Sequence, residues 1–184
     1  KQYSEDFLGG ASIVASHFGS FCKKVTLTSL ISNDDKGRFA IKELKKNKIK
    51  LNIFSEDDRP TTNKNSHIVN MHNLLKIDEL NNASISNSTL NKILKILQKD
   101  KSDILIFSDF RHGIFNNLTI PSFLRNISDK KFKVADSQVA SRWGNISDFK
   151  EFDLITPTER EARYSLFEQD TPIRNLIDNL VKKS

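Results

Sequence analysis

Acidic side chains follow three predicted strands of this chain at the point where each strand ends. Asp109 lies two residues after the apolar run 104–107, and Asp136 and Glu161 follow the next two predicted strands. In open parallel sheets, ligands bind in the crevice outside the carboxyl ends of the strands. Carboxylates placed there can hold a hydrated Mg²⁺ ion or orient a substrate hydroxyl group. The spacing therefore predicts a binding site at this edge of the sheet.

Helix capping is the alternative role for the same residues. Thr156 or Thr158, each followed by Pro or Glu, makes a good N-cap with acidic residues in the first turn. Capping is the better explanation for any one of the three segments taken alone. Three such segments at one sheet edge shift the balance toward a site.

A polar segment is the second candidate for ligand contact. Pro60 pushes Arg59 toward an extended conformation, and Thr61 and Thr62 favour a pleated backbone. Both faces of this predicted strand stay polar until Ile68. A core strand cannot be so polar, because buried polar groups need partners. We therefore expect either an exposed edge strand or a strand that covers a hydroxyl-rich or phosphorylated ligand in a wet cleft.

Glycines and metal-binding side chains give weaker signals. Gly9 and Gly10 precede a predicted helix, where they allow close backbone approach to a ligand and offer free N–H groups. The four histidines have no metal-ligand spacing, and Cys22 alone cannot complete a zinc site.

Length and composition limit the class of protein. The 184 residues fit one domain with a real core, and 37% hydrophobic with 28% charged residues is typical of soluble globular proteins. No apolar run approaches the roughly 18 residues that a membrane helix needs. A single cysteine excludes an internal disulfide framework. We expect a cytoplasmic protein with no membrane partner.

The net charge of +6 raises the question of nucleic acid. Apolar residues interleave the lysines between 42 and 50, as on an amphipathic helix that runs into a strand, and aromatic residues for base stacking are absent there. A solvated helix face is the favoured interpretation. A general attraction to anionic substrates explains the charge as well as RNA does.

Apolar periodicity predicts strands that alternate with helices. Helices are expected at about 11–18, 34–46, 84–97, 117–128 and 156–167 and from 172 onward, and strands at about 25–31, 49–54, 59–69, 74–77, 103–107, 132–135 and 154–155. This alternation predicts an α/β fold with a mainly parallel sheet covered by helices on both faces. Strands within about 49–77 are expected to form a separate small lid. With no internal repeat or linker, residues 1–184 are predicted to form one domain.

Taken together, these motifs resemble the ribokinase-like PfkB family of carbohydrate kinases, with a three-layer α/β/α fold. The branch most similar contains the heptose-7-phosphate kinase domain of ADP-heptose synthesis. The motifs that carry the resemblance are 8–11, 57–64, 74–78, 108–110 with Gly113, Asp136, and 154–157 with Glu161. They cover nearly all of the chain, which corresponds to a central part of the family's domain, incomplete at both ends.

The resemblance implies an ATP- and Mg²⁺-dependent transfer of the γ-phosphoryl group to an alcohol group of a sugar or sugar phosphate. The substrate-binding positions that it implies are Gly9, Gly10, Arg59, Thr61, Lys64 and Asp109. The cofactor-binding positions are Asp136, Thr158 and Glu161, of which Glu161 is the metal position. It also implies a homodimer through the lid strands.

Departures from the family pattern limit this expectation. Ile13 stands at a sugar-binding Asn position, and Thr158 replaces the Asn of Asn-x-x-Glu. The Gly-Ala-Gly-Asp segment with the catalytic base is expected beyond Ser184, and the chain's six glycines form no cluster that could cradle a phosphate. This chain alone is therefore expected to be inactive. The alternatives are a non-catalytic sugar-phosphate-binding or regulatory domain of the same fold and, less favoured, an RNA-associated protein.

Overall fold

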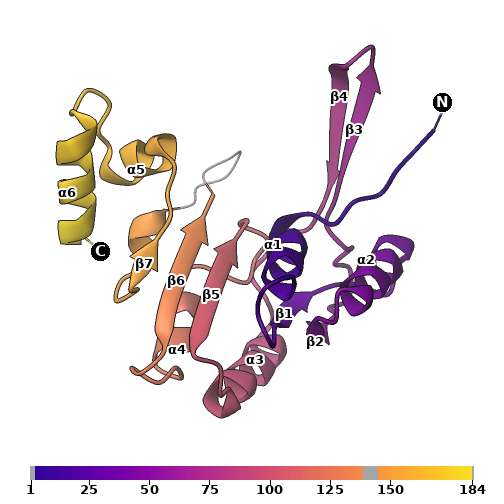
Figure 1. Cartoon of the computed structure of the whole chain (residues 1–184), viewed down its shortest axis with the longest axis horizontal. Helices are drawn as coiled ribbons and strands as arrows, with labels where there is room; N and C mark the ends of the chain where they lie inside the picture. The colour runs from indigo at the N-terminus through magenta and orange to yellow at the C-terminus, as the bar shows by residue number, and fades with distance from the viewer. Residues whose placement is uncertain (1–2, 139–144, 184) are drawn as a thin grey trace. The chain divides into compact units, whose positions relative to one another are not determined.

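The computed structural model of this chain describes residues 3–138 and 145–183. It divides into two compact units, residues 1–81 (unit 1) and 82–184 (unit 2) (Figure 1). Each unit contains parallel strands with helices between them. The expectation of one domain over 1–184 stays a prediction. In the described ranges, no helix is long and apolar enough to cross a membrane.

Unit 1 contains two helices and four strands. Their bounds are α1 (Gly10–Gly19), β1 (Thr26–Leu30), α2 (Asp35–Lys46), β2 (Lys50–Phe54), β3 (Asn63–Val69) and β4 (His72–Glu79). Strands β1 and β2 pair in parallel, from Thr26 opposite Lys50 to Leu30 opposite Phe54. The core between them and the two helices consists of Ala15, Leu27, Ile31, Leu44 and Ile49. These elements confirm the predicted α/β alternation.

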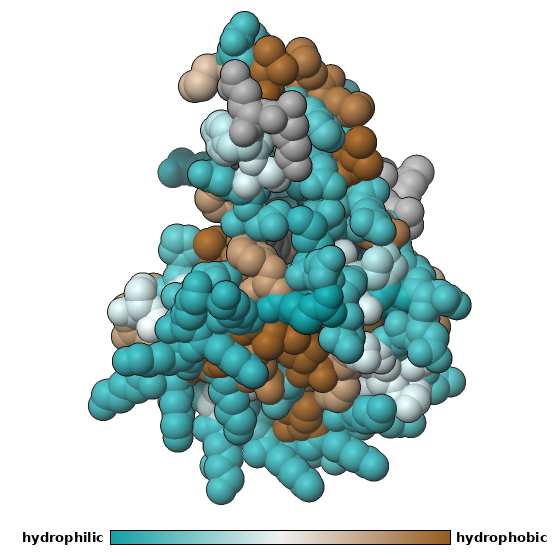
Figure 2. All heavy atoms as spheres, turned by 90° about the vertical axis from the view of Figure 1, so that its right-hand side faces the viewer, coloured by the Kyte–Doolittle hydropathy of each residue, from teal (hydrophilic) through white to brown (hydrophobic). Residues whose placement is uncertain are grey.

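Strands β3 and β4 form an antiparallel hairpin, which we call the flap (Figure 1). Asn70 and Met71 form its turn with positive φ angles of 48° and 68°, as tight hairpin turns require. Every residue of β4 is exposed. Figure 2 shows hydrophobic residues at the upper end of the face in view, where the tip of the flap lies. Because β2 pairs with β1, the predicted lid consists of β3 and β4 alone.

The segment 59–62 differs from its prediction as a strand. Strand β3 begins only at Asn63. Pro60 has no N–H group to donate, and the N–H of Thr61 donates to Asp34 Oδ2 at 2.8 Å instead of to a neighbouring strand. The segment is therefore the foot of the flap and not part of its ladder.

Unit 2 contains four α-helices, a short 3₁₀ helix and three strands among its described residues. Their bounds are α3 (Asn87–Lys99), β5 (Ile104–Asp109), α4 (Thr119–Leu124), β6 (Phe132–Ser137), η1 (Ile146–Asp148), β7 (Leu154–Ile155), α5 (Glu159–Leu166) and α6 (Ile173–Lys183). Helix α4 is shorter than the predicted 117–128 at both ends, since it also ends at Leu124. Its start is delayed because the side chain of Asn116 accepts the N–H groups of Leu118 and Thr119.

The three strands of unit 2 form a parallel sheet in the order β5-β6-β7. Phenylalanine rings fill one side of it. Phe107 on β5 lies with its ring centroid 5.0 Å from Phe115, 5.9 Å from Phe123 and 5.1 Å from Phe152. This apolar packing fixes the strands whose carboxyl ends carry the predicted site.

Candidate functional site

The carboxyl edge of the unit 2 sheet brings together the polar residues that follow its strands. Ser108 pairs with Asp136 and Asp109 with Ser137 in the parallel register of β5 and β6. Because side chains alternate along a strand, Asp109 and Ser137 share one face and Asp136 belongs to the other. The edge therefore carries two groups, one around Asp109 and one around Asp136.

Asp109 is buried, with only 1% of its surface exposed. Its Oδ2 accepts a hydrogen bond from Ser137 Oγ at 3.0 Å, and its Oδ1 accepts the N–H of Arg111 at 2.7 Å. The guanidinium Nε of Arg111 lies 2.8 Å from Oδ2. Burial raises the pKa of Asp109, the nearby Asp148 adds to the rise, and the charge of Arg111 opposes it. Both oxygens are engaged within the protein, so Asp109 fixes the loop that follows β5.

Arg111 is a residue that the sequence reasoning did not single out. Its Nη2 donates to Ser137 Oγ at 3.0 Å and lies 3.7 Å from the Asp148 carboxylate. Its backbone φ angle of 59° is unusual for a residue other than glycine. The sequence did contain a signal for this ion pair, because a basic residue stands two positions after an aspartate at the end of a predicted strand. The arrangement pairs this cation with two carboxylates, Asp109 and Asp148, at the carboxyl edge of the sheet.

Asp136 and Glu161 form the second group. The hydroxyl of Thr156 donates to Asp136 Oδ1 at 3.2 Å. Burial raises the pKa of Asp136, and the negative charge of Glu161 raises it further, whereas the Thr156 hydrogen bond lowers it. Two carboxylates from neighbouring elements therefore repel each other here.

Thr158 and Glu161 also make the helix cap that was the alternative interpretation. The N–H of Thr158 donates to Glu161 Oε2 at 2.7 Å, and the N–H of Glu161 donates to Thr158 Oγ1 at 3.3 Å. This capping box confirms the structural role of both residues. Their cofactor-binding role stays a prediction.

The described part of the chain holds no group of three or more His, Cys, Asp or Glu that could hold a metal ion alone. Mg²⁺ does not need such a cage, because proteins usually bind it through one or two carboxylates together with water and substrate phosphates. Asp136 and Glu161 fit this chemistry. Burial is the main cause of the raised pKa of Asp136, and Glu161 adds a smaller rise through its negative charge, which a bound cation would offset.

In unit 1, Gly9 and Gly10 open helix α1. Gly10 has a φ of 53°, which favours glycine. Gly9 has an extended backbone as the N-cap, and a side chain added there would meet no atom within 4 Å. Neither packing nor conformation in the structure explains a glycine at position 9. Ile13, one turn further on, is 39% exposed.

The foot of the flap contains Arg59 and Thr61. Arg59 is only 9% exposed, and it donates from Nε to Glu56 Oε2 at 3.0 Å and from Nη1 to the carbonyl of Asn81 at 2.8 Å. Thr61 Oγ1 accepts the N–H of Ser32 at 2.9 Å. These contacts give both residues a structural role, and their predicted substrate contacts stay predictions.

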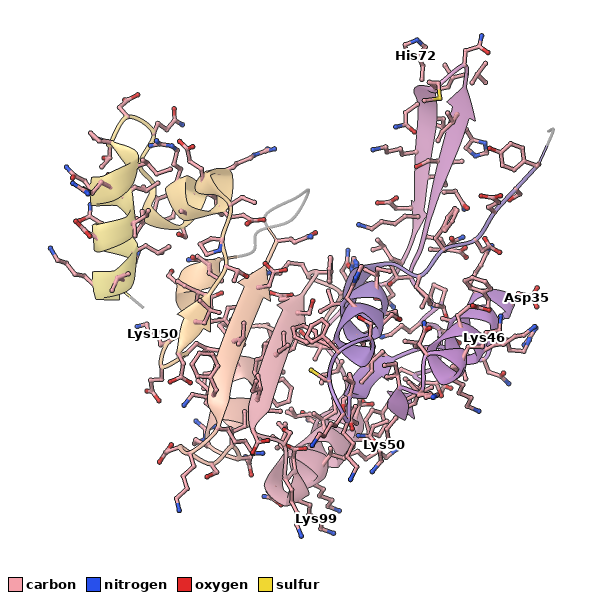
Figure 3. The ribbon with its side chains drawn as sticks, in the orientation of Figure 1. Asp35, Lys46, Lys50, His72, Lys99 and Lys150 are labelled. Carbon is pink, nitrogen blue, oxygen red and sulfur yellow. The ribbon has the colours of Figure 1, made fainter. Side chains whose placement is uncertain are left out.

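Lys64 lies at the start of the flap, opposite Asp78 in the β3–β4 register, and it is exposed. Figure 3 shows side chains projecting from both sides of the flap, with His72 labelled at its tip. Gly9, Gly10, Arg59, Thr61 and Lys64 therefore belong to unit 1, whereas Asp109, Asp136, Thr158 and Glu161 belong to unit 2.

The fold is that of the ribokinase-like sugar kinases, as solved structures show. Phosphofructokinase-2 from Escherichia coli in complex with fructose-6-phosphate matches 98% of this chain with a TM-score of 0.73 and 14% identity, over 63% of its own chain. Ribokinase from Giardia lamblia matches 92% with a TM-score of 0.68 and 13% identity, over 53% of its own chain. The predicted fold class is confirmed.

Within that class, the chain is a distant homologue of the bifunctional HldE proteins. It is 27% identical over 158 residues to HldE of Sulfurimonas denitrificans and 25% identical over 158 residues to HldE of Helicobacter hepaticus, in each case over 84% of this chain. The chain spans about a third of the length of these relatives (32%). No family model matches it.

Proposed function

We propose that the chain forms the sugar-binding and metal-binding part of an ATP-dependent carbohydrate kinase that phosphorylates a sugar phosphate similar to heptose 7-phosphate. One observation carries the proposal. The carboxyl edge of the unit 2 sheet gathers Asp136, Thr156 and Glu161, and the pKa of Asp136 is raised by burial and by the second carboxylate. Such paired acids at a strand edge are suited to Mg²⁺ and phosphate chemistry.

In this proposal, Mg²⁺ neutralises charge on the phosphates of ATP, and Glu161 and Asp136 would hold it. The chain's own residues would bind these groups and orient them. Glu161 keeps one oxygen on the N–H of Thr158, so the capping box fixes its direction. Asp109 and Ser137 hold Arg111 in place next to the edge, and this contact orders the loop that follows β5.

The sugar would approach the backbone of Gly9 and Gly10 under the flap. Gly9 supports this placement, because no atom of the protein lies where its side chain would be. Lys64 is an exposed cation on the flap and suits a substrate phosphate. Arg59 and Thr61 would act by holding the foot of the flap. The ATP requirement favours a cytoplasmic location.

We also propose that the flap pairs two copies of the protein. Apolar side chains on its strands are exposed, with Leu74 at 67%, Leu75 at 52% and Ile77 at 48%. Exposed apolar strands are prone to pair with another chain. A homodimer through the flap would cover them.

A second candidate is a non-catalytic sugar-phosphate-binding domain. The six glycines of this chain, Gly9, Gly10, Gly19, Gly37, Gly113 and Gly144, include no cluster that could cradle a transferred phosphoryl group, and the sugar contacts proposed above are common to both candidates. In the kinase proposal, a further segment of a longer protein provides that cradle and the catalytic base.

Calorimetry and a phosphoryl-transfer assay separate the two candidates. The full-length protein would be titrated with heptose 7-phosphate, fructose 6-phosphate and Mg·ATP, and product formation would be followed with labelled ATP. Binding of both substrates with turnover supports the kinase. Sugar-phosphate binding without nucleotide binding supports the second candidate, and failure to bind any sugar phosphate contradicts both.

A further inference from the structure

Positive charge is concentrated in one segment of unit 1. Residues 23–50 contain nine of the chain's 29 Lys and Arg residues but only three of its 23 Asp and Glu residues. The surplus of six equals the net charge of +6 for the whole chain, so the remaining residues are electrically balanced. The charge is therefore a local property of this segment.

The topology gathers most of these residues at one end of unit 1. The parallel strands β1 and β2 begin at the same edge, and α1 and α2 end there before them. The N–H of Lys50 donates to the carbonyl of Val25 at 3.0 Å, and Asn47 Nδ2 lies 3.2 Å from Ser16 Oγ. We call this end, with its exposed lysines, the basic end; the lysines are Lys23, Lys24, Lys45, Lys46, Lys48 and Lys50.

Few acids offset these lysines. Glu43 pairs with Lys46 at 2.5 Å. Asp34 and Asp35 lie at the opposite end of α2, about 16 Å away at a rise of about 1.5 Å per residue. Lys46 and Lys50 are labelled in Figure 3. The basic end therefore keeps a strong positive surplus.

An exposed aromatic ring lies beside the charge. Phe21 is 70% exposed, and its ring centroid lies 5.2 Å from that of Phe18, which supports it from α1. Phe21 precedes Lys23 and Lys24 by two and three residues. An apolar ring flanked by flexible cations is suited to the boundary between lipid headgroups and acyl chains.

We propose that the basic end docks on an anionic lipid surface, with the lysines against headgroup phosphates and Phe21 inserted between the lipids. Each lysine near such a surface strengthens binding about fivefold. The segment has eight lysines and one arginine, and that Arg38 pairs with Asp35. Nucleic-acid sites depend more on guanidinium forks and several stacking rings, so a membrane fits these residues better than RNA does.

This docking is compatible with a substrate under the flap. Thr61, in the foot of the flap, contacts Ser32 just beyond the carboxyl end of β1, whereas the basic end lies at the amino end of the same strand. The proposal departs from the sequence-based expectation of no membrane partner. That expectation was based on the absence of a spanning segment, which a surface contact does not need.

Vesicle co-sedimentation of the full chain tests the proposal. Phosphatidylcholine vesicles with about 30% phosphatidylglycerol would be compared with pure phosphatidylcholine vesicles at low and high salt. The quadruple variant Lys23→Gln, Lys24→Gln, Lys45→Gln, Lys50→Gln is expected to weaken binding to anionic vesicles about a hundredfold or more. Phe21→Ser is expected to weaken it about tenfold.

A matched control changes the net charge equally within unit 2: Lys92→Gln, Lys95→Gln, Lys99→Gln, Lys101→Gln. It should bind like the wild type, and circular dichroism should show both quadruple variants folded. Equal losses in the two variants, or no wild-type binding to anionic vesicles, would overturn the proposal. Tighter binding to single-stranded RNA than to vesicles, lost in the first variant, would identify a nucleic-acid surface instead.

Discussion

The carboxylate of Asp34 joins helix α2 to Thr61 in the foot of the flap. Its Oδ1 accepts the N–H of Gly37 at 2.7 Å, and its Oδ2 accepts the N–H of Thr61 at 2.8 Å. Burial on its own raises the pKa of Asp34, but the hydrogen bonds from Thr61 and Gly37 outweigh it and lower the pKa. The N-cap residue of α2 therefore also holds the foot of the flap.

Asp34→Ala is expected to lower the free energy of unfolding by about 2 kcal/mol, because it removes a cap and a charge-assisted hydrogen bond. Asp34→Asn keeps an oxygen for Gly37 and should cost about half as much. Urea unfolding measures both, with the exposed Asp35→Ala as the control. Since a lowered carboxylate pKa stabilises the fold above the unfolded value of 3.8, the difference from wild type should disappear as the pH falls through the folded pKa. A loss independent of pH would contradict this role.

Arg59 is expected to hold the flap in place. Arg59→Ala removes the ion pair with Glu56, whose side chain is 13% exposed, and the hydrogen bond to the carbonyl of Asn81. The cost should be about 3 kcal/mol, with faster amide exchange in β3 and β4. Arg38→Ala, which breaks an exposed ion pair with Asp35, should cost less than about 1 kcal/mol. Equal costs for the two variants would show that Arg59 has no such role.

Asp136→Asn is expected to raise the melting temperature at pH 7. The pKa of Asp136 is raised by burial and by Glu161, so its ionised form destabilises the folded state. The penalty is absent below the unfolded value of 3.8, develops as the pH rises to the folded pKa and persists above it. The variant's advantage should therefore vanish at low pH in calorimetric scans. Loss of Mg²⁺ binding in the same variant would support the metal role, and a lower melting temperature at pH 7 would refute the repulsion.

A flap-mediated dimer should depend on the apolar residues of β4. The variant Leu75→Ser, Ile77→Ser is expected to shift the full-length protein from dimer to monomer by at least about tenfold in dissociation constant, as measured by sedimentation velocity. The variant Ile177→Ser, Val181→Ser removes comparable exposed groups, at 53% and 69%, from α6. It should leave the association unchanged. An unaltered dimer in the β4 variant would exclude the flap as the interface.

Short-range patterns accounted for most of the elements. The start of α2 after the N-cap Asp34 and the apolar run of β5 were predicted because local capping and hydrophobicity determine them. The foot of the flap was not, because Thr61 takes its partner Asp34 from 27 residues away. No pattern within residues 59–62 contains that contact.

In the candidate site, too, local sequence indicated some features, and contacts made in the folded chain determined the others. Asp109 was predicted from its place after a strand, whereas its ion pair with Arg111 depends on a turn with positive φ at Arg111. Thr158 and Glu161 were expected either to cap or to bind, and the structure confirms the cap. The sequence could not distinguish these roles, because both need the same oxygens at the same spacing.

Gly37 shows how narrowly the region around α2 tolerates change. A Cβ atom there would lie 1.9 Å from the carbonyl oxygen of Ser32 and 2.9 Å from Thr61 Oγ1. Even alanine would force the helix away from the backbone that Asp34 and Thr61 hold together. Gly9, by contrast, has free space around it. Random mutagenesis selected only for folding should therefore spare position 37 and drift at position 9, so mutational tolerance would separate a glycine kept by packing from one kept by a ligand.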